Sequence, residues 1–563
     1  MTHRTALLLA LFSTACDFGK SADNHDDEEW EEDGEWDGST ETPWDDGSVP
    51  DGPAGTDDID TDGGDADGIP DADGLDGEHF DADADADADS DGSDHTDVDS
   101  DGGSHDTGSS DDTGSSDHDG SSDDDGCDDD GCDDDGSADS YEFESRFIEG
   151  ASSVSYSGQI FRHTLIQELR GYIGELTERV DEEGSFEPGD ATSGLLYYFD
   201  FSDSDGDDEL RFAPEDALQT RFADIGGGAG LVGKIAGNDA ATDHRDWATE
   251  FSGFPVAGTT SPESLVQHWF TEIDDRTIER LYGSGDDYPV YLSNNGVDRR
   301  QLINIFLQGA VSFSQGTDDY LDDDIDGKGL LADNTAAVDG KPYSSLEHNW
   351  DAAFAYFGAC RNYGSLTATE IKANENDANG DGAIDLLSEY VWGASMNVAK
   401  RDVGSEGVYD MTGDMWTGFY TGREIISGAD GALSEEELDT VRVARDLAIS
   451  TWEKAIAATV AHYINDLIAE ITVYGDASYS FADLAKHWSA AKGYALWFQF
   501  NPHSPMTDEQ FSTLHELLGW TSPNHLPGSG EDDLAYIYIA ELEDARTLLG
   551  EVYGFDEGVL EDW

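Results

Sequence analysis

The sequence predicts an all-α fold, a helical bundle built as one large or two packed bundles after a disordered acidic stalk. From Tyr141 onward, apolar residues recur at spacings of three and four along several segments, which is the period of one helix face. Strict apolar–polar alternation, typical of half-buried strands, is scarce over the same residues. The region 141–563 is long enough for one large domain or two ordinary ones.

Individual helices are marked by their periodicity and by their first residues. The segments 157–180 and 302–313 each carry an apolar stripe. Residues 434–474 predict one or two long helices that begin at the capping box SEEE, in which a serine and a glutamate three residues later satisfy each other's backbone N–H groups. Further helix signals stand at Ser344, Thr507 and 532–553. A boundary is expected near 320–345, where an acidic, glycine-containing stretch interrupts the helices.

Residues 1–16 have the features of a bacterial lipoprotein signal peptide. A basic start precedes an apolar run over 6–12, and small residues then lead to Cys16. A signal peptidase needs small side chains before its cut, which here would leave Cys16 as a lipidated N-terminus. We therefore expect an exported protein that is lipid-anchored to the outer membrane or cell surface. An ordinary secretory signal cut near Ala15 is the alternative, and it also places the protein outside the cytoplasm.

Residues 17–140 predict a disordered stalk rich in Asp, Gly and Ser. Between Ser21 and Ser140 there are 49 Asp and Glu residues and no Lys or Arg. Such a segment buries too little apolar surface to offset the entropy of ordering, and its charges repel one another. The run DGGDADGIPDADGLDGE at 62–78 resembles the calcium-loaded repeats of thrombospondin-type stalks. We expect loose Ca²⁺ association there, with folded calcium modules as the alternative.

The acidity continues into the region 141–563. The whole chain has a formal net charge of −101, and this region contributes 25 basic and 78 acidic residues to it. A surface of this sign repels nucleic acid and anionic membranes, so neither is an expected partner. The expected partners are the membrane, through the lipid anchor, and an unknown ligand or envelope protein.

Residues 377–389, DANGDGAIDLLSE, resemble a calcium loop of the EF-hand or dockerin kind. Oxygen atoms at alternate positions of such a turn converge on one side, which suits a hard cation. The expected Ca²⁺ ligands are Asp377, Asn379, Asp381, Ala383, Asp385 and Glu389. The pattern expects a glutamate at position 12, where Ser388 stands, so ligation by Glu389 requires a shifted helix start. The alternative is a metal-free turn that caps the following helix.

The segment 344–360 offers a second metal candidate. His348 and Asp351 are three residues apart, so they share a helix face and could bind Zn²⁺ or Fe. Further ligands that could join them, if their helices face one another, are His462, His487, Glu347 and Glu453. The alternative for each histidine is a satisfied position in the apolar core.

Other reactive side chains are expected to be structural. Cys360 is predicted to be a buried core thiol, and Lys492 a buried lysine with a carboxylate partner. The sequence has no H-E-x-x-H and no G-x-S-x-G motif, so it predicts no catalytic residue. An enzyme is therefore not the favoured function.

Four blocks resemble a family of uncharacterised bacterial lipoproteins that is catalogued only as a domain of unknown function. They are SSVSYSGQIFRHTLIQEL (152–169), GKGLLADNTAAVDGKPYSSLEHNWDAAFAYFGA (327–359), NGDGAIDLLSEYVWGASMNVAKRD (379–402) and HWSAAKGYALWFQFNP (487–502). The resemblance covers nearly all of 141–563. It implies an exported, all-helical domain in which the calcium-like loop belongs to the family pattern, and it implies no activity.

A second similarity is to the imelysin-like proteins, which are exported helical proteins of iron uptake and peptidase families. It implies the alternative function, a metal-dependent hydrolase or iron-uptake protein that uses His348 and Asp351. The sequence H-N-W-D at 348–351 lacks the glycine and the glutamate of their G-x-H-x-x-E motif. The favoured prediction is a non-enzymatic cell-envelope lipoprotein, a Ca²⁺-stabilised helical domain on an acidic stalk that binds a ligand, metal or envelope partner.

Overall fold

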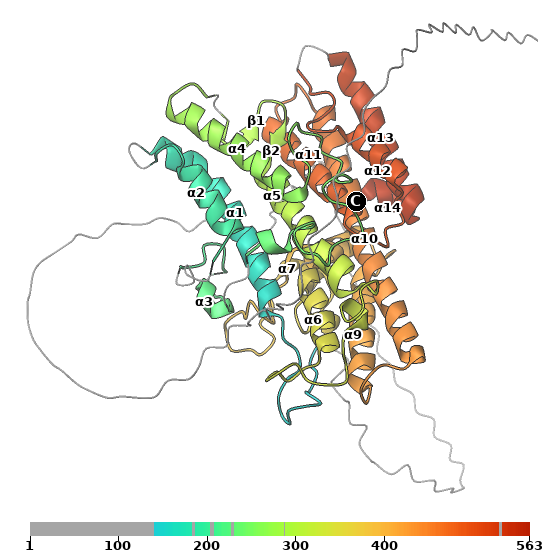
Figure 1. Ribbon diagram of the computed structural model, residues 1–563. Helices are drawn as coiled ribbons and strands as arrows, with labels where there is room; N and C mark the ends of the chain where they lie inside the picture. Colours follow the sequence, from blue (N-terminus) through green and yellow to red (C-terminus); the bar gives the residue numbers. More distant parts are fainter. Residues whose placement is uncertain are drawn as a thin grey trace, which may run out of the picture. The chain divides into compact units, whose positions relative to one another are not determined.

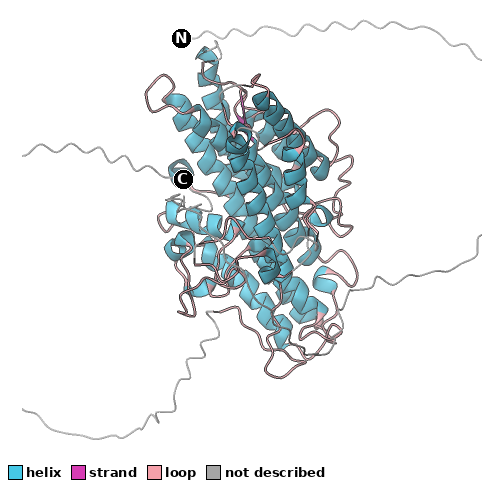
Figure 2. Cartoon of the chain, turned by 90° about the vertical axis from the view of Figure 1, so that its left-hand side faces the viewer, coloured by secondary structure: helices cyan, strands magenta, loops and turns pink. Residues whose placement is uncertain are grey.

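Helices dominate the described chain, which confirms the all-α prediction (Figure 2). The computed structural model describes residues 140–563 except 183–185, 203–207, 215, 227–229, 286–287 and 529–531. The predicted signal peptide, Cys16 and the stalk up to residue 139 therefore lie outside the described residues. The strands in the described part are β1 (Leu292–Ser293) and β2 (Val297–Asp298), which pair antiparallel in a small hairpin directly before α5.

The α-helices are joined by connections of widely different lengths. In chain order they are α1 (Ser157–Asp181), α2 (Asp190–Phe199), α3 (Phe222–Ile225), α4 (Pro262–Leu281), α5 (Arg299–Leu307), α6 (Ser345–Phe357), α7 (Ala368–Ala373), α8 (Gly393–Gly404), α9 (Met411–Gly428), α10 (Glu435–Thr472), α11 (Phe481–Ala495), α12 (Asp508–Leu518), α13 (Asp532–Tyr553) and α14 (Glu557–Asp562). Two π-helical turns, η3 (Gln308–Phe313) and η4 (Gln315–Tyr320), extend α5. Single 3₁₀ turns are η2 (Val232–Lys234), η5 (Gly329–Leu331), η6 (Tyr363–Ser365) and η7 (Leu496–Gln499).

The helix α10 is the central element of the bundle. It begins at the predicted capping box, where the Ser434 hydroxyl accepts the Glu437 N–H and the Glu437 carboxylate accepts the Ser434 N–H. It is one helix of 38 residues, not two, and it packs against α8, α9, α11, α13 and α14 (Figure 1). Its middle is buried on most sides around Trp452 and Val460, because neighbouring helices cover it all round.

A second group of helices surrounds α1. The predicted apolar stripe of α1 is buried, from Phe161 to Val180, and it faces α2, α4, α5 and α6. Capping boxes at Ser344 and Thr507 begin α6 and α12, and α13 has the predicted bounds. The stretch 320–344 contains no α-helix, yet all described residues belong to one compact unit. None of the described helices has the length and apolar character needed to cross a membrane.

The predicted helix over 302–313 changes its winding halfway. It is α-helical to Leu307 and π-helical from Gln308 to Tyr320, apart from Ser314 between the two turns. Indole rings pack closely against its glycines: a Cβ on Gly309 would lie 2.3 Å from a Trp497 ring atom. Wide helical turns of this kind occur often at functional positions. The apolar period alone does not distinguish them from α-helix.

A close helix contact makes Gly422 of α9 the most size-restricted position in that helix. A Cβ there would lie 2.0 Å from the ring of Trp350 in α6. We expect Gly422→Ala to cost about 1–3 kcal/mol of unfolding free energy, because the buried indole must move. Gly171→Ala in α1, where nothing lies within 4 Å, should be neutral or slightly stabilising. Urea unfolding of both variants tests the difference, and equal stabilities would contradict it.

Candidate functional site

The predicted calcium loop lies between α7 and α8, and its acidic side chains fold back onto the loop's own backbone. The Asp377 carboxylate accepts the N–H groups of Gly380, Asp381 and Gly382 at 2.8, 3.1 and 2.9 Å. The Asn379 side chain accepts the Asp381 N–H at 2.8 Å. Gly382 has φ +85°, the conformation that glycine favours and that the sixth position of such a loop requires.

The side chain of Glu389 enters this loop from the far side. Its two carboxylate oxygens accept the N–H of Asn379 at 3.2 Å and that of Asp385 at 2.8 Å, and the residue is only 4 % exposed. The chain can reach back in this way because no helix follows the loop at once. Residues 386–389 form turns, and α8 begins only at Gly393. The following helix therefore starts later than the loop pattern assumes.

A distant segment braces the second half of the loop. Ile384 forms a parallel bridge with Ala217, with N–H to Asp216 O at 2.9 Å and Leu218 N–H to Ile384 O at 2.8 Å. The Gln219 amide donates to Asp385 Oδ1 and accepts the Leu386 N–H, both at 2.8 Å. Gln219 could not be recognised from the sequence as part of this site, because its partners are more than 160 residues away. These contacts fix Asp385 in position at the end of the loop.

The expected ligand side chains thus lie in one loop, where their oxygen atoms accept hydrogen bonds from backbone N–H groups. Within the described ranges, no group of three or more His, Cys, Asp or Glu side chains is placed to hold a metal ion. Ion binding would require Asp377, Asp381 and Asp385 to turn from these N–H groups toward a common centre, with the Ala383 carbonyl between them.

His348 and Asp351 lie on α6 as predicted, but each contacts different partners. His348 Nδ1 lies 2.9 Å from Ser155 O, and its ring stacks on Tyr343 with centroids 4.7 Å apart. Burial lowers the pKa of His348. Asp351 is fully buried and accepts from the Tyr141 hydroxyl at 2.9 Å and from Arg423 Nε at 2.7 Å. The carboxylate proposed as a metal ligand is therefore engaged in an ion pair.

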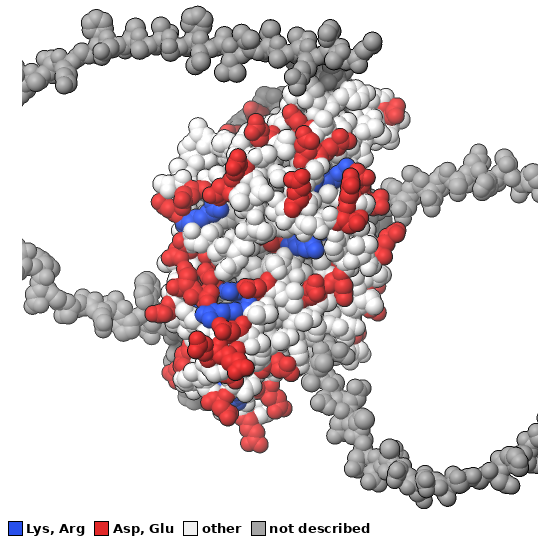
Figure 3. Space-filling model, turned by 90° about the vertical axis from the view of Figure 1, so that its right-hand side faces the viewer, with Lys and Arg blue, Asp and Glu red and all other residues white. Residues whose placement is uncertain are grey.

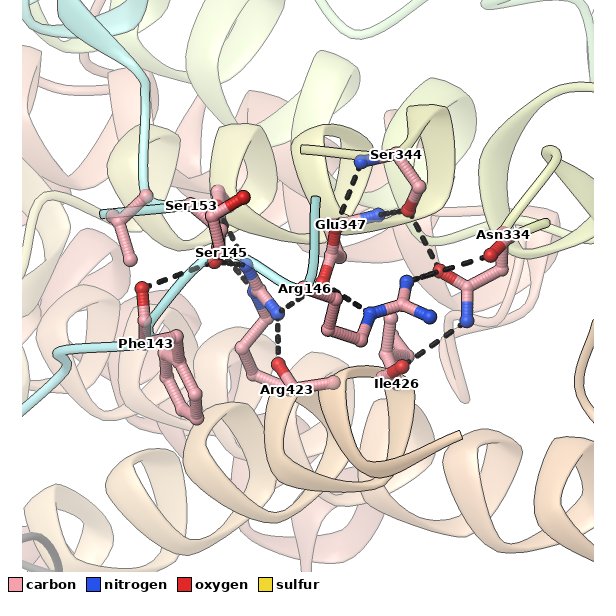
Figure 4. A network of polar contacts seen from close by, with 12 residues as sticks. Phe143, Ser145, Arg146, Ser153, Asn334, Ser344, Glu347, Arg423 and Ile426 are labelled. Carbon is pink, nitrogen blue, oxygen red and sulfur yellow. Dashed lines mark hydrogen bonds and ion pairs between the residues drawn. The ribbon is translucent and has the colours of Figure 1, made fainter. Parts of the chain in front are cut away.

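Asp351 belongs to a buried charge network that joins residues 146–153, α6 and α9. Figure 4 shows Glu347 and Arg423 of this network. Arg423 of α9 donates to Asp351, to Glu347 at 3.4 Å and to Ser153 at 2.7 Å. Glu347 also accepts from Arg146 Nε at 3.2 Å and from the Ser344 N–H at 2.7 Å, within the predicted capping box. Arg423, Glu347 and Asp351 have no exposed side-chain surface. Because these three side chains are shielded from water, the two carboxylates are balanced by Arg423 and by the partly exposed Arg146.

Burial and pairing act in opposite directions on this network. Burial raises the pKa of Asp351, while Arg423 lowers it. The pKa of Arg423 is raised because its two carboxylate neighbours outweigh the cost of its burial. The sequence did not identify Arg423, although an arginine on the apolar side of the helix 411–428 was a signal that could have been used.

His462 and His487 converge on a different carboxylate, that of Asp466. Their Nε2 atoms lie 3.4 and 4.0 Å from Asp466 Oδ2, and the two histidines come from the adjacent helices α10 and α11. Burial, reinforced by Arg401, lowers the pKa of His462 to about 2, so its imidazole is neutral. His348 instead contacts Ser155 and Tyr343. His348 and Asp351 therefore do not share a site with His462 and His487.

Two further sequence predictions can be compared with the structure. Cys360 is a buried free thiol, as predicted, and burial raises its pKa to about 12. Lys492 is buried, but its partner is not a carboxylate: Nζ lies 2.6 Å from His515 Nδ1 and 2.8 Å from Gly519 O. Burial lowers the pKa of Lys492 well below its usual range. Two neutral acceptors therefore satisfy the hydrogen-bonding needs of the buried amine. Both lie at the end of α12, so Lys492 joins α11 to that helix end.

The surface of the described region is strongly acidic. Figure 3 shows one face on which Asp and Glu side chains are widely spread, with few Lys and Arg among them. Several Lys and Arg side chains are held in ion pairs, as Arg280 is by Asp181 at 2.7 Å. The surface potential therefore favours cations in general over anions.

The family comparison agrees with the predicted resemblance. Residues 275–520 match the model of a family described as a domain of unknown function (DUF4856). This confirms the resemblance to a family without assigned activity, over a shorter range than the expected 141–563. The matched range contains the loop 377–389 and the residues Glu347, Asp351 and Arg423. No curated protein and no solved structure matches the chain significantly.

Proposed function

We propose that this protein is a non-enzymatic cell-envelope lipoprotein whose helical domain is stabilised by Ca²⁺ and presented on the acidic stalk to a ligand, metal or envelope partner. The observation that carries the calcium part of this proposal is the loop 377–389. Asp377, Asn379, Asp381 and Asp385 stand at the positions from which a calcium loop supplies its oxygen ligands. Glu389, one residue after the last position, already projects into the loop.

The position of the loop supports a stabilising rather than a catalytic ion. The second half of the loop is hydrogen-bonded to the segment 216–219. Its last residues are hydrogen-bonded to the segment that follows α6, where Arg361 N–H donates to Ser388 O at 2.7 Å. An ion that tightened the loop would therefore hold three separate parts of the chain together. Binding to the folded state alone stabilises it by mass action.

The proposal of a binding role rather than catalysis rests on how the reactive groups are used. Lys492, Asp351 and Glu347 are buried in hydrogen-bonded contacts, so no substrate can reach them in this conformation. The export and lipid-anchor part rests on the sequence 1–16. It is tested by metabolic labelling with a radioactive fatty acid: Cys16→Ala should abolish label incorporation.

Thermal melting of the full chain tests the calcium loop. The wild type should melt higher in Ca²⁺ than in chelator, by about 3 °C at a concentration 100-fold above Kd. Asp377→Ala combined with Asp381→Ala should abolish this rise, while the loss of hydrogen bonds to the loop's N–H groups lowers the melting temperature in chelator as well. Asp339→Ala with Asp430→Ala, two exposed acids outside the loop, is the matched control and should keep the Ca²⁺ response. Equal destabilisation in both conditions would count against bound calcium.

The alternative, an imelysin-like metal-dependent hydrolase or iron-uptake protein, would use His348 and Asp351. It requires Asp351 to exchange Arg423 for a metal ion, which the buried network opposes. Elemental analysis of the purified protein distinguishes the two functions. Stoichiometric zinc or iron that is lost in His348→Ala would favour the alternative, whereas calcium alone would favour the first proposal.

A further inference from the structure

The imidazole of His244 lies between two hydrogen-bond acceptors. Its Nδ1 is 2.7 Å from Asp318 Oδ2, at the end of the π-helical turn η4, and its Nε2 is 3.1 Å from the backbone oxygen of Gln499 in η7. A backbone carbonyl oxygen can only accept, so Nε2 must carry a proton. This contact also prevents Nε2 from acting as a general base toward a substrate.

The second contact requires a second proton. Either Nδ1 is protonated and donates to the Asp318 carboxylate, or Asp318 is protonated and donates to Nδ1. In both cases the pair holds two protons and titrates as one unit. If one proton is removed, a nitrogen lone pair faces a carboxylate oxygen at 2.7 Å, and the contact becomes repulsive.

The surroundings of Asp318 determine how the pair responds to pH. Its side chain is fully buried, and its second oxygen, Oδ1, has no hydrogen-bond partner. Burial, with Asp322 and Asp243 nearby, raises the pKa of Asp318 to about 6, although His244 acts in the opposite direction. The carboxyl group of Asp318 therefore holds a proton more strongly than in the unfolded chain, and its contact with His244 is lost when the shared proton leaves as the pH rises.

The other charged groups around the pair come from every neighbouring element and are already engaged or of like sign. They are Asp243 on the same segment, Asp319 with Lys234 at 3.7 Å, Asp322 with His503 at 3.4 Å, Asp324, and Arg445 with Asp323 at 3.2 Å. The cations among them, Lys234 and Arg445, are each already paired with a carboxylate other than that of Asp318. The pair must therefore hold its own proton.

The contacts of His244 attach the chain segment 239–254, which lies between η2 and α4, to η4 and η7. The same segment packs Trp247 on Phe500, with ring centroids 5.3 Å apart, and bonds Ser252 to the Gln499 side chain at 3.2 and 3.3 Å. All of these partners lie in η7 or directly after it. The segment is also held at Arg245, whose guanidinium lies 2.8 Å from Asp508 of α12, so loss of the His244 contacts would loosen the segment around residue 244 rather than detach it.

We infer that His244 and Asp318 form a proton-dependent latch, which fixes the segment 239–254 to η4 and η7 at acid pH and lets it loosen around His244 when the shared proton is lost. The latch depends on the geometry of both ring nitrogens and not on the proposed calcium loop, which is built from other residues.

Hydrogen exchange of the full chain, followed by mass spectrometry, tests the latch. After correction for the intrinsic effect of pH on exchange, peptides from 239–254 should exchange about tenfold faster near pH 8.5 than near pH 5, while peptides from α10 serve as the reference. In Asp318→Asn the carboxamide N–H can donate to Nδ1 of a neutral imidazole at any pH. This variant should therefore keep the segment protected at both pH values, whereas His244→Phe should leave it open at both.

Two results would overturn the inference. One is a wild-type segment whose corrected exchange does not change with pH, and the other is Asp318→Asn with the same pH response as the wild type. If Asp318→Asn fails to fold, ¹⁵N resonances of the His244 ring in the wild type decide the question. They should change over the same pH range as the exchange, and a ring whose resonances stay constant would overturn the latch.

Discussion

Arg423→Met is expected to lower the unfolding free energy by about 3–5 kcal/mol at neutral pH. The guanidinium of Arg423 is the shared partner of two carboxylates, Glu347 and Asp351, and none of the three side chains is exposed. Methionine keeps much of the apolar volume but leaves the carboxylates with less compensation in a region of low dielectric constant. The change in the midpoint of urea unfolding at constant m-value measures the effect.

Charge and packing can be separated in this experiment. If the cost comes from unpaired carboxylates, it should decrease at acid pH, because burial raises the pKa of Asp351 and favours its neutral form, and Arg423→Met with Asp351→Asn should recover part of the lost stability. The matched control is Arg211→Met, since Arg211 pairs with Glu175 in a largely exposed ion pair at 2.7 Å. That substitution should cost at most about 1 kcal/mol. Similar losses in the two arginine variants would contradict the interpretation.

Glu453 of α10 should make the domain less stable as the pH rises from about 5 to about 8. This carboxyl group is fully buried, and burial raises its pKa from 4.5 to about 7 despite hydrogen bonds from Ser504 at 2.6 Å and Tyr553 at 2.7 Å. Because the folded-state pKa exceeds the unfolded value, the associated stability is complete below about 4.5 and is lost as the pH rises through about 7. The shift corresponds to roughly 3 kcal/mol.

Glu453→Gln removes this titration while keeping the shape of the side chain. The stability of the variant relative to the wild type should therefore increase by about 2–3 kcal/mol between pH 5 and pH 8, as measured by urea unfolding at each pH. Glu437→Gln, in the exposed capping box of the same helix, is the control: bonds from Ser434 lower the pKa of Glu437, so the difference between this variant and the wild type should stay constant from pH 5 to pH 8. A constant difference between Glu453→Gln and the wild type would contradict the prediction.

The positions of many helices could be predicted because their signals are local. The boxes at Ser344, Ser434 and Thr507 satisfy the first N–H groups of a helix with side chains three residues apart. The stripe of α1 follows from the period of the helix and the burial of one face. The π-helical continuation of α5 was not predictable in this way, because rings from other helices, such as Trp497, pack against its glycines.

The candidate sites likewise have some features that local sequence determines and others that long-range packing determines. By itself the sequence determined the all-α class, the order of oxygen-bearing residues in 377–389, and the pairing of His348 and Asp351 on one helix, because each depends on neighbours within a few residues. Only the tertiary structure decided that Asp351 belongs to Arg423 and to Tyr141, 72 and 210 residues away. It also decided that Gln219 braces Asp385. A buried charge takes whichever partner the packing of distant helices brings within hydrogen-bond distance, and that choice leaves no periodic or local signal in the chain.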